Sequence, residues 1–193
     1  MVEEGFKTAA RELIENWRNE RTPLNAGATE DELLALEKRF ASTLPPDFRY
    51  FYSLANGMTD YESDKYFFSL WPLEWIATEI ERGRSLLEEG GEEASGEGGE
   101  NPVCSAVFSL FRDFSVAQKK PRPVERIRDP FAFCKIEIPF GDVMIDSYRY
   151  RLCQDKEGRF SVYWEGAELL ADSFGHFLLR YLTEPEKIYL YLI

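Results

Sequence analysis

Two adjacent prolines, Pro45 and Pro46, constrain this chain more than any other local feature. Proline lacks a backbone N–H and its ring clashes inside a helix, so an approaching helix must end here and a new one can begin. Upstream, Thr29 and Glu32 have the spacing of a capping box, which predicts a helix start at the next residue after Thr29. Downstream, apolar residues recur at helical spacing until Gly57, where a left-handed residue would close a second helix. This stretch is predicted to be two short helices joined by a proline corner.

Four short pieces of sequence, in chain order, carry a resemblance to a known family. They are Leu44 to Phe48 with its two prolines, Asn56-Gly57, Leu70 to Glu74 with its Trp-Pro step, and Ala171 to Phe174 leading into a further helix. In this order the chain resembles the SUKH superfamily over residues 29–182. That superfamily includes fungal Smi/Knr-type cell-wall regulators and many bacterial toxin-immunity proteins. The resemblance implies an α+β domain that works by binding another protein.

Net charge narrows the classes of partner. The 193 residues include 35 Asp and Glu against 23 Lys and Arg, which gives a net charge of −12. Such a field repels phosphate backbones, whose binding depends on Lys and Arg displacing counterions, so no nucleic-acid partner is expected. The same field would speed association with a basic protein. Solubility alone is the plainer explanation of the charge.

The sequence does not predict a membrane protein or a disulfide framework. Its longest apolar runs, at 66–71 and 188–193, are far too short to cross a bilayer, and acids stand where a signal peptide has bases. We therefore expect a cytoplasmic protein without a membrane partner. The three cysteines show no C-x-x-C spacing, which favours small buried hydrophobes over a thiolate metal site; they are Cys104, Cys134 and Cys153.

The order of predicted elements indicates one α+β domain over residues 1–193. An extra helix is expected at 1–20, because Phe6 to Trp17 have apolar residues on one helical face. The segment at about 88–102 is rich in Gly and Glu and is predicted to be a flexible insertion. We expect a mainly antiparallel sheet of about five to six strands with helices packed on one side. Its strands are predicted at 66–71, 103–114, 131–138, 142–153 and 159–164, and a last helix begins at Asp172 or Ser173.

Alternation within the predicted strand 142–153 assigns its two faces. Tyr150 and Leu152 would point into the core, while Arg149 and Arg151 would form a cationic outer face. Asp142 has the same parity as Asp146 in this strand, so the two carboxylates would lie on one side.

No constellation for catalysis or for metal binding is visible. Acid–base catalysis near neutral pH usually needs a histidine, and only His176 is present, on a helix whose apolar face leaves it outward. Paired acids can hold a hard cation or divide acid and base roles, but these acids lack the ligand order of a calcium loop and are expected to be solvated. We therefore expect no catalytic residues, no metal and no cofactor.

Acidic loops and strand acids are the best candidates for contact with a partner. The predicted partner-binding residues are Glu62, Asp64, Glu92, Glu93, Asp142 and Asp146.

Two functions follow from the resemblance and the charge. The first is an immunity protein that neutralises a cognate toxin, with a nuclease as one candidate, by stoichiometric binding of its basic active-site cleft. The alternative is a housekeeping regulatory or scaffold protein of the Smi/Knr type with no toxin partner. An enzyme with an unfamiliar carboxylate site is a third reading, for which loss of turnover in Asp142→Asn with folding intact would be needed.

Overall fold

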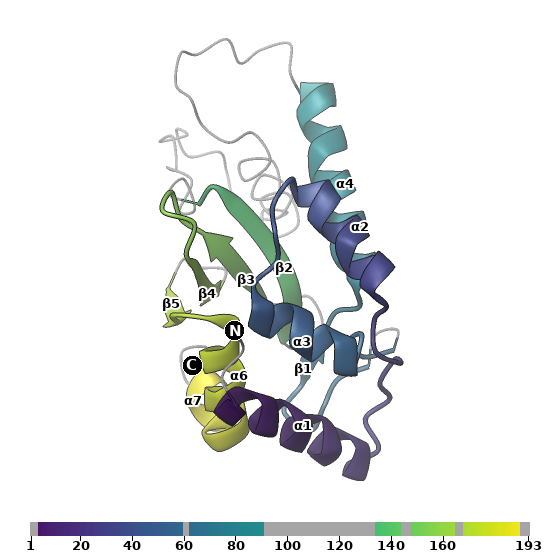
Figure 1. The fold of residues 1–193 in the computed structure, drawn as a ribbon, viewed down its shortest axis with the longest axis vertical. Coiled ribbons are helices and arrows are strands. Elements are labelled where there is room, and N and C mark those ends of the chain that lie inside the picture. The colour runs from purple at the N-terminus through teal and green to yellow at the C-terminus, as the bar shows by residue number, and fades with distance from the viewer. Residues whose placement is uncertain (1–3, 60–61, 91–133, 144–147, 165–167, 190–193) are drawn as a thin grey trace, which may run out of the picture.

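The computed structural model describes residues 4–59, 62–90, 134–143, 148–164 and 168–189 (Figure 1). Its helices are α1 (Glu4–Asn19), α2 (Glu30–Phe40), α3 (Pro46–Leu54), α4 (Leu73–Gly90), α6 (Phe174–Thr183) and α7 (Pro185–Tyr189). Its strands are β1 (Phe68–Leu70), β2 (Ile136–Val143), β3 (Tyr148–Gln154), β4 (Phe160–Trp164) and β5 (Leu169–Ala171).

The strands form one five-stranded sheet in the order β1-β2-β3-β4-β5, and every neighbouring pair is antiparallel. The predicted α+β class with an antiparallel sheet is confirmed. Several boundaries differ: β1 is shorter than predicted, β2 lies further along the chain than 131–138, and β5 was not predicted. The predicted strand 103–114 lies outside the described residues, as does the predicted insertion at 88–102 apart from its first three residues, which continue α4.

The two helices around the proline corner form as predicted. Thr29 caps α2, because its side chain accepts a bond from the backbone N–H of Glu32 while the Glu32 carboxylate accepts one from the backbone N–H of Thr29. Gly57 is left-handed, with φ +72°, but it lies beyond the cap of α3 at Ala55. Its role is close packing, since a Cβ there would lie 2.5 Å from the backbone nitrogen of Pro72.

An aromatic core joins α1, α3 and α6 to one face of the sheet. Phe174 of α6 contacts Phe48 of α3 at 4.9 Å between ring centroids, and it contacts Phe140 of β2 at 5.2 Å. Trp17 of α1 is only 1% exposed and stacks on Phe68 of β1. Helix α1 therefore belongs to the same core as the sheet and α6 (Figure 1).

The opposite face of β3 corrects the prediction of an exposed cationic surface. Arg149 and Arg151 do alternate with core residues, but they are 4% and 0% exposed. Arg151 forms an ion pair with Glu137 of β2, whose carboxylate is also buried. Arg149 pairs with Glu79 of α4 at 3.0 Å. Alternation predicts which face a residue lies on, but paired charges can be buried there, because each ion replaces lost water with a partner.

Candidate functional site

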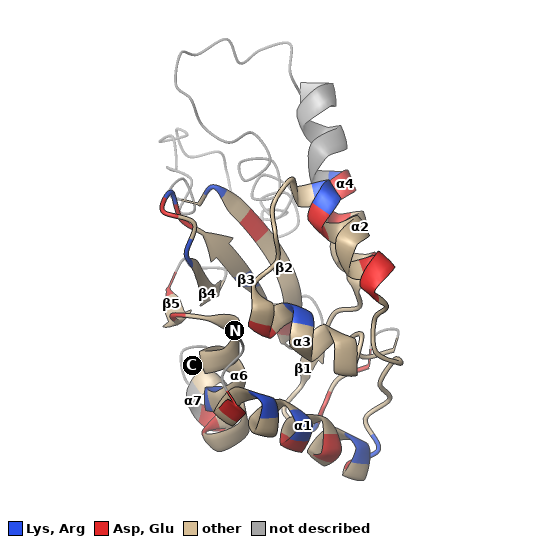
Figure 2. Cartoon of the chain, viewed as in Figure 1, with Lys and Arg blue, Asp and Glu red and all other residues tan. Residues whose placement is uncertain are grey.

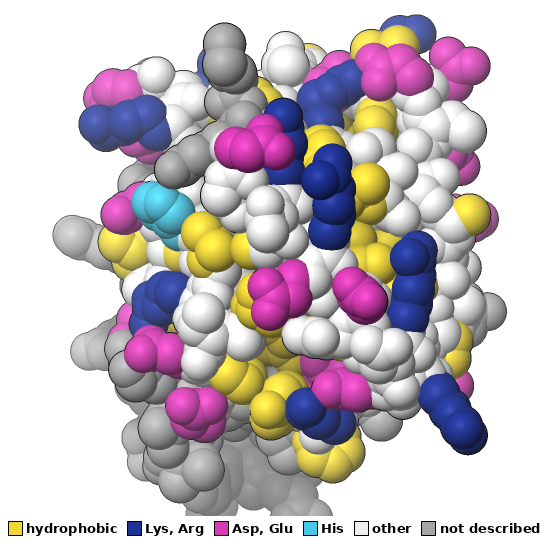
Figure 3. All heavy atoms as spheres, turned by 60° about the horizontal axis from the view of Figure 1, so that its bottom comes forward, with side chains coloured by type: hydrophobic (Ala, Val, Ile, Leu, Met, Phe, Trp, Pro, Cys, Tyr) yellow, Lys and Arg dark blue, Asp and Glu magenta, His cyan; other side chains and the backbone are white. Residues whose placement is uncertain are grey.

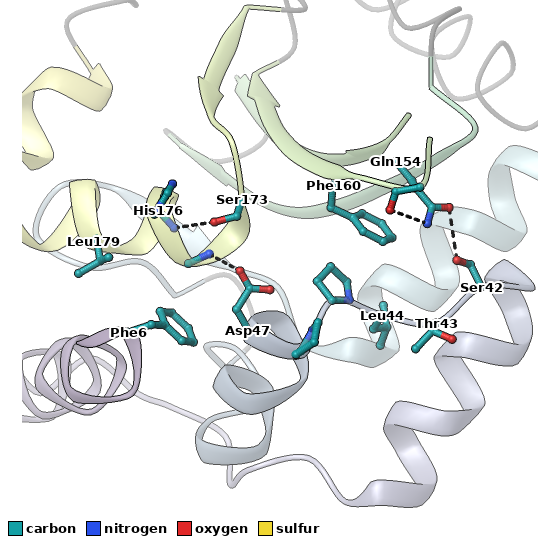
Figure 4. A pocket seen from close by; sticks show the side chains of 14 residues that line it. Phe6, Ser42, Thr43, Leu44, Asp47, Gln154, Phe160, Ser173, His176 and Leu179 are labelled. Carbon is teal, nitrogen blue, oxygen red and sulfur yellow. Dashed lines mark hydrogen bonds between the residues drawn. The ribbon is translucent and has the colours of Figure 1, made fainter. Parts of the chain in front are cut away.

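A groove of about 620 Å³ opens where the proline corner, α1, α6 and the β3–β4 hairpin meet (Figure 4). We call it the proline-corner groove. Its walls combine apolar rings and methyl groups with a few hydroxyl and amide groups. The lining residues are Phe6, Ser42, Thr43, Leu44, Pro45, Pro46, Asp47, Gln154, Gly158, Phe160, Ser173, Gly175, His176 and Leu179.

Side chains of α2 and α3 hold the proline corner in place. The backbone N–H of Leu44 donates to the Glu37 carboxylate at 2.9 Å, and Arg49 donates to the same oxygen at 2.7 Å. Leu44 and Pro45 are buried beneath the corner, whereas Pro46 is exposed on its surface. This wall is therefore preorganised, because hydrogen bonds within the chain hold its backbone.

Asp47 fastens the corner to the start of α6. One carboxylate oxygen accepts a bond from the backbone N–H of Gly175 at 2.7 Å, and the other accepts one from Phe48 at 2.9 Å. Both donors lie in first turns of helices, where the helix dipole favours a negative charge. A Cβ on Gly175 would lie 3.1 Å from Asp47 and from the Phe6 ring, so glycine lets the two segments approach.

The opposite wall is the β3–β4 hairpin. The Ser42 hydroxyl donates to the side-chain oxygen of Gln154 at 3.4 Å, and the Gln154 amide donates to the carbonyl of Gly158 at 3.3 Å (Figure 4). Phe160 adds a half-buried ring to this side. Segments that are more than 100 residues apart in the chain thus face each other across the groove.

The described residues that line the groove include Asp47 and His176 but form no hydrogen-bonded acid–base pair. His176 is exposed, as predicted, and its bond to the Ser173 hydroxyl comes from the backbone nitrogen, not from the imidazole (Figure 4). That bond caps α6, so of the two predicted candidates, Asp172 and Ser173, it is Ser173 that caps the helix. Asp47 has both oxygens bonded to backbone amides. The lining can hold an apolar side chain and a few hydrogen-bonding groups, which is typical of a binding groove.

Three of the six predicted partner-binding acids lie among the described residues, and they differ in exposure. Glu62 is exposed, whereas Asp64 and Asp142 are each 5% exposed, so the expectation that these two are solvated is wrong. The other three lie outside the described residues: Glu92, Glu93 and Asp146.

Asp64 and Asp142 accept hydrogen bonds inside the fold. Asp64 accepts bonds from the Trp17 indole N–H at 3.0 Å and from the Tyr181 hydroxyl, and burial raises the pKa of its carboxyl. Asp142 accepts a bond from the Trp71 indole N–H at 2.7 Å. It lies on β2 and not on the strand that follows, so its predicted parity with Asp146 does not apply.

Two of the sequence pieces that resemble the family also line the proline-corner groove. The piece from Leu44 to Phe48 and the piece from Ala171 to Phe174 carried the family resemblance, and each also contributes residues to the groove lining. Only the folded chain shows that these two pieces meet.

Figure 3 shows that charges of both signs surround hydrophobic side chains on this side of the molecule. Figure 2 likewise shows Lys and Arg interspersed with Asp and Glu along α1. Among the described residues, no group of three His, Cys, Asp or Glu side chains is placed to hold a metal ion. Within the same part of the chain, no helix has both the length and the apolar character that a membrane span requires.

The chain matches the model of a known protein family over a region that includes most of the groove. The family model of the SMI1 / KNR4 family (SUKH-1) matches residues 27–180, from the segment before α2 to within α6. The match includes the proline corner, the hairpin and the start of α6, whereas Phe6 of α1 lies outside it. A comparison with curated proteins finds no match. The matched region covers most of the chain, and the protein therefore belongs to the SMI1 / KNR4 family (SUKH-1).

Proposed function

We propose that this protein is a non-catalytic binding module that holds a segment of a protein partner in the proline-corner groove. The observation that carries this proposal is a preorganised groove of about 620 Å³ whose described lining residues form no acid–base pair. Family membership supports a protein partner. Apolar lining from Phe6, Phe160 and Leu179 would receive an apolar side chain, while Ser42 and Gln154 offer hydrogen bonds at one end.

Within this class, we propose an immunity protein that neutralises a cognate toxin by stoichiometric binding. The net charge of −12 supports association with a basic toxin domain, such as a nuclease that needs a cationic cleft for nucleic acid. Glu62 remains a candidate contact because it is exposed. Glu92, Glu93 and Asp146 remain candidates from the sequence alone.

Co-expression with the product of the adjacent upstream gene tests this function. We expect that product to be toxic alone, harmless together with this chain, and retained on it in a one-to-one complex. A product that is neither toxic nor retained would refute the immunity proposal.

A pair of threonine variants tests the groove itself. Thr43 is exposed at the groove, so Thr43→Arg should fill it and weaken capture of the partner by about tenfold or more without unfolding the chain. Thr183→Arg is the control, because Thr183 is exposed and does not line the groove. Equal capture by both variants would place the contact elsewhere.

The alternative is a regulatory or scaffold protein of the Smi/Knr type without a toxin partner. The groove lining favours this alternative in one respect: among the described residues that line the groove, the only acid is Asp47, whose oxygens are bonded to Gly175 and Phe48. A groove without available charge does not select a basic partner. Binding of a non-toxic partner that is insensitive to salt would support this alternative.

A further inference from the structure

A second groove, of about 670 Å³, lies between α2 and α4, away from the proline corner. Figure 1 shows the two helices side by side, and contacts between them confirm it. We call it the α2–α4 groove. Its lining residues are Asn25, Glu32, Ala35, Leu36, Arg39, Asn56, Pro72, Leu73, Glu74, Trp75, Ala77, Thr78 and Glu81.

One end of the α2–α4 groove is fixed by two asparagine side chains. The Asn56 side-chain oxygen accepts a bond from the backbone N–H of Leu73 at 2.9 Å, which fastens the start of α4. The Asn25 amide donates to the carbonyls of Asn56 at 3.1 Å and Met58 at 3.0 Å. The groove is therefore present before any ligand binds, which lowers the entropic cost of binding.

The floor of this groove is apolar and partly aromatic. Leu36 and Leu73 are buried, and Trp75 is half-buried with its ring plane at 68° to that of Trp71. The adjacent Trp71 makes a cation–π contact within the fold, because the Arg149 guanidinium lies 5.0 Å from its ring centroid. An indole face is the best aromatic partner for a guanidinium.

The rim of the α2–α4 groove is acidic. Three of its lining residues are glutamates and one is a base, Arg39, which pairs with Glu81. Glu74 is exposed on α4. Glu32 accepts bonds from the backbone N–H and the hydroxyl of Thr29, at 2.7 and 2.8 Å, and these bonds lower the pKa of its carboxyl. Its carboxylate therefore stays ionised at neutral pH.

We propose that the α2–α4 groove binds an arginine-containing basic segment of a partner protein. The acidic rim complements its positive charge, and the apolar floor with Trp75 accepts the planar guanidinium and its aliphatic stem. Lysine fits less well, because its ammonium is a strongly hydrated point charge that does not stack. A nucleic acid is disfavoured by the glutamates. This surface is separate from the proline-corner groove and requires neither a toxin nor occupancy of that groove.

Tryptophan indole NMR of the full-length chain tests the proposal with nona-arginine and nona-lysine peptides as probes. We expect nona-arginine to shift the Trp75 indole signal, assigned with Trp75→Phe, and to leave the Trp17 signal in place, because the Trp17 indole is buried against Asp64. Nona-arginine should bind about threefold more tightly than nona-lysine. An unmoved Trp75 signal at saturation would overturn the proposal.

Matched variants separate this groove from the general charge of the chain. Glu74→Lys should weaken nona-arginine binding about fivefold more than Glu12→Lys, which makes the same charge change at an exposed site on α1. Equal weakening by both would show that only net charge attracts the peptide and would overturn the proposal.

A second pair tests the shape of the groove. Thr78 and Thr183 are both exposed helical threonines whose hydroxyls donate to the carbonyl four residues earlier. Thr78→Arg should fill the α2–α4 groove and abolish the Trp75 shift, whereas Thr183→Arg should not. Thr43→Arg, which fills the proline-corner groove, should also leave the shift intact, so the two proposals can fail separately. A Trp75 shift that survives Thr78→Arg would contradict binding in this groove.

Discussion

Replacing Asp64 with alanine should destabilise the fold by about 3 kcal/mol. The carboxylate accepts bonds from the Trp17 indole at 3.0 Å, from the Tyr181 hydroxyl, and from the backbone N–H groups of Tyr66 at 2.9 Å and Phe68 at 3.1 Å. It thereby connects α1, α6 and the turn before β1.

The magnitude follows from what the substitution leaves behind. Trp17 is 1% exposed, and a buried donor that loses its acceptor costs about 1–3 kcal/mol. The bond from Tyr181 to a charged acceptor is worth about 1.5–3 kcal/mol. Removing the carboxylate also removes the cost of burying it, which offsets part of these two losses. We therefore expect a net loss of free energy of unfolding nearer the sum of the two lower limits than that of the two upper ones.

Urea denaturation followed by tryptophan fluorescence measures this loss. Glu62→Ala is the control, since Glu62 is an exposed acid in the same turn and its removal should change the free energy of unfolding by less than about 0.5 kcal/mol. A double-mutant cycle with Trp17→Phe should show coupling between Trp17 and Asp64. A loss below about 1 kcal/mol for Asp64→Ala would refute the structural role assigned to this carboxylate.

The pH dependence of Asp64→Asn gives an independent check. Burial raises the pKa of the Asp64 carboxyl above its unfolded value, so between the two values the native state binds more protons than the unfolded state. The part of Asp64's contribution to stability that depends on this proton is therefore complete below the unfolded pKa and is lost as pH rises through the folded one. The difference in free energy of unfolding between the wild type and Asp64→Asn should shift against the wild type as pH rises from about 4. If the wild type instead gains stability relative to Asp64→Asn as pH rises, the raised pKa is contradicted.

Two backbone predictions concern residues in the left-handed region. Gly57→Ala should lower the free energy of unfolding by more than about 2 kcal/mol, because φ is +72° and the new Cβ would lie 2.5 Å from the nitrogen of Pro72. Gly158→Ala should lower it by about 1–2 kcal/mol, because φ is +84° but the nearest neighbour of the new Cβ is 3.9 Å away. Similar losses for the two variants in thermal unfolding would contradict the close-packing role of Gly57. Phe67 has φ +62° and is 62% exposed. Because Asn adopts the left-handed region more readily than Phe does, Phe67→Asn should raise the free energy of unfolding by up to about 1 kcal/mol. A clear loss of stability in the same assay would show that the ring packs in solution.

Local chemistry explains which elements the sequence predicts correctly. The capping box at Thr29, the cap at Ser173 and the turn before Gly158 each depend on residues within a few positions of one another. The helical spacing around the proline corner likewise needs no distant partner. Strand ends and β5 were harder to place, because a strand becomes stable only through pairing with its neighbours.

Charged residues show where local reasoning stops. Glu62 and Asp64 are two positions apart in one acidic turn, but one is exposed and the other is surrounded by Trp17 and Tyr181 from two helices. Arg151 has the alternation of a surface residue but is fully buried, paired with Glu137 on the neighbouring strand. No pattern in the sequence identifies these partners, since they come from elements that are distant in the chain.

The sequence by itself determined the α+β class, the proline corner with its two helices, and the resemblance to the family, because these depend on hydrophobic spacing, capping and prolines. Only the tertiary structure decided the site. The proline-corner groove exists because Asp47 bonds to Gly175 and Ser42 bonds to Gln154 across more than 100 residues of chain. Burial likewise removes Asp64 and Asp142 from the accessible surface, since access to a partner is a property of the packed surface and not of residue type.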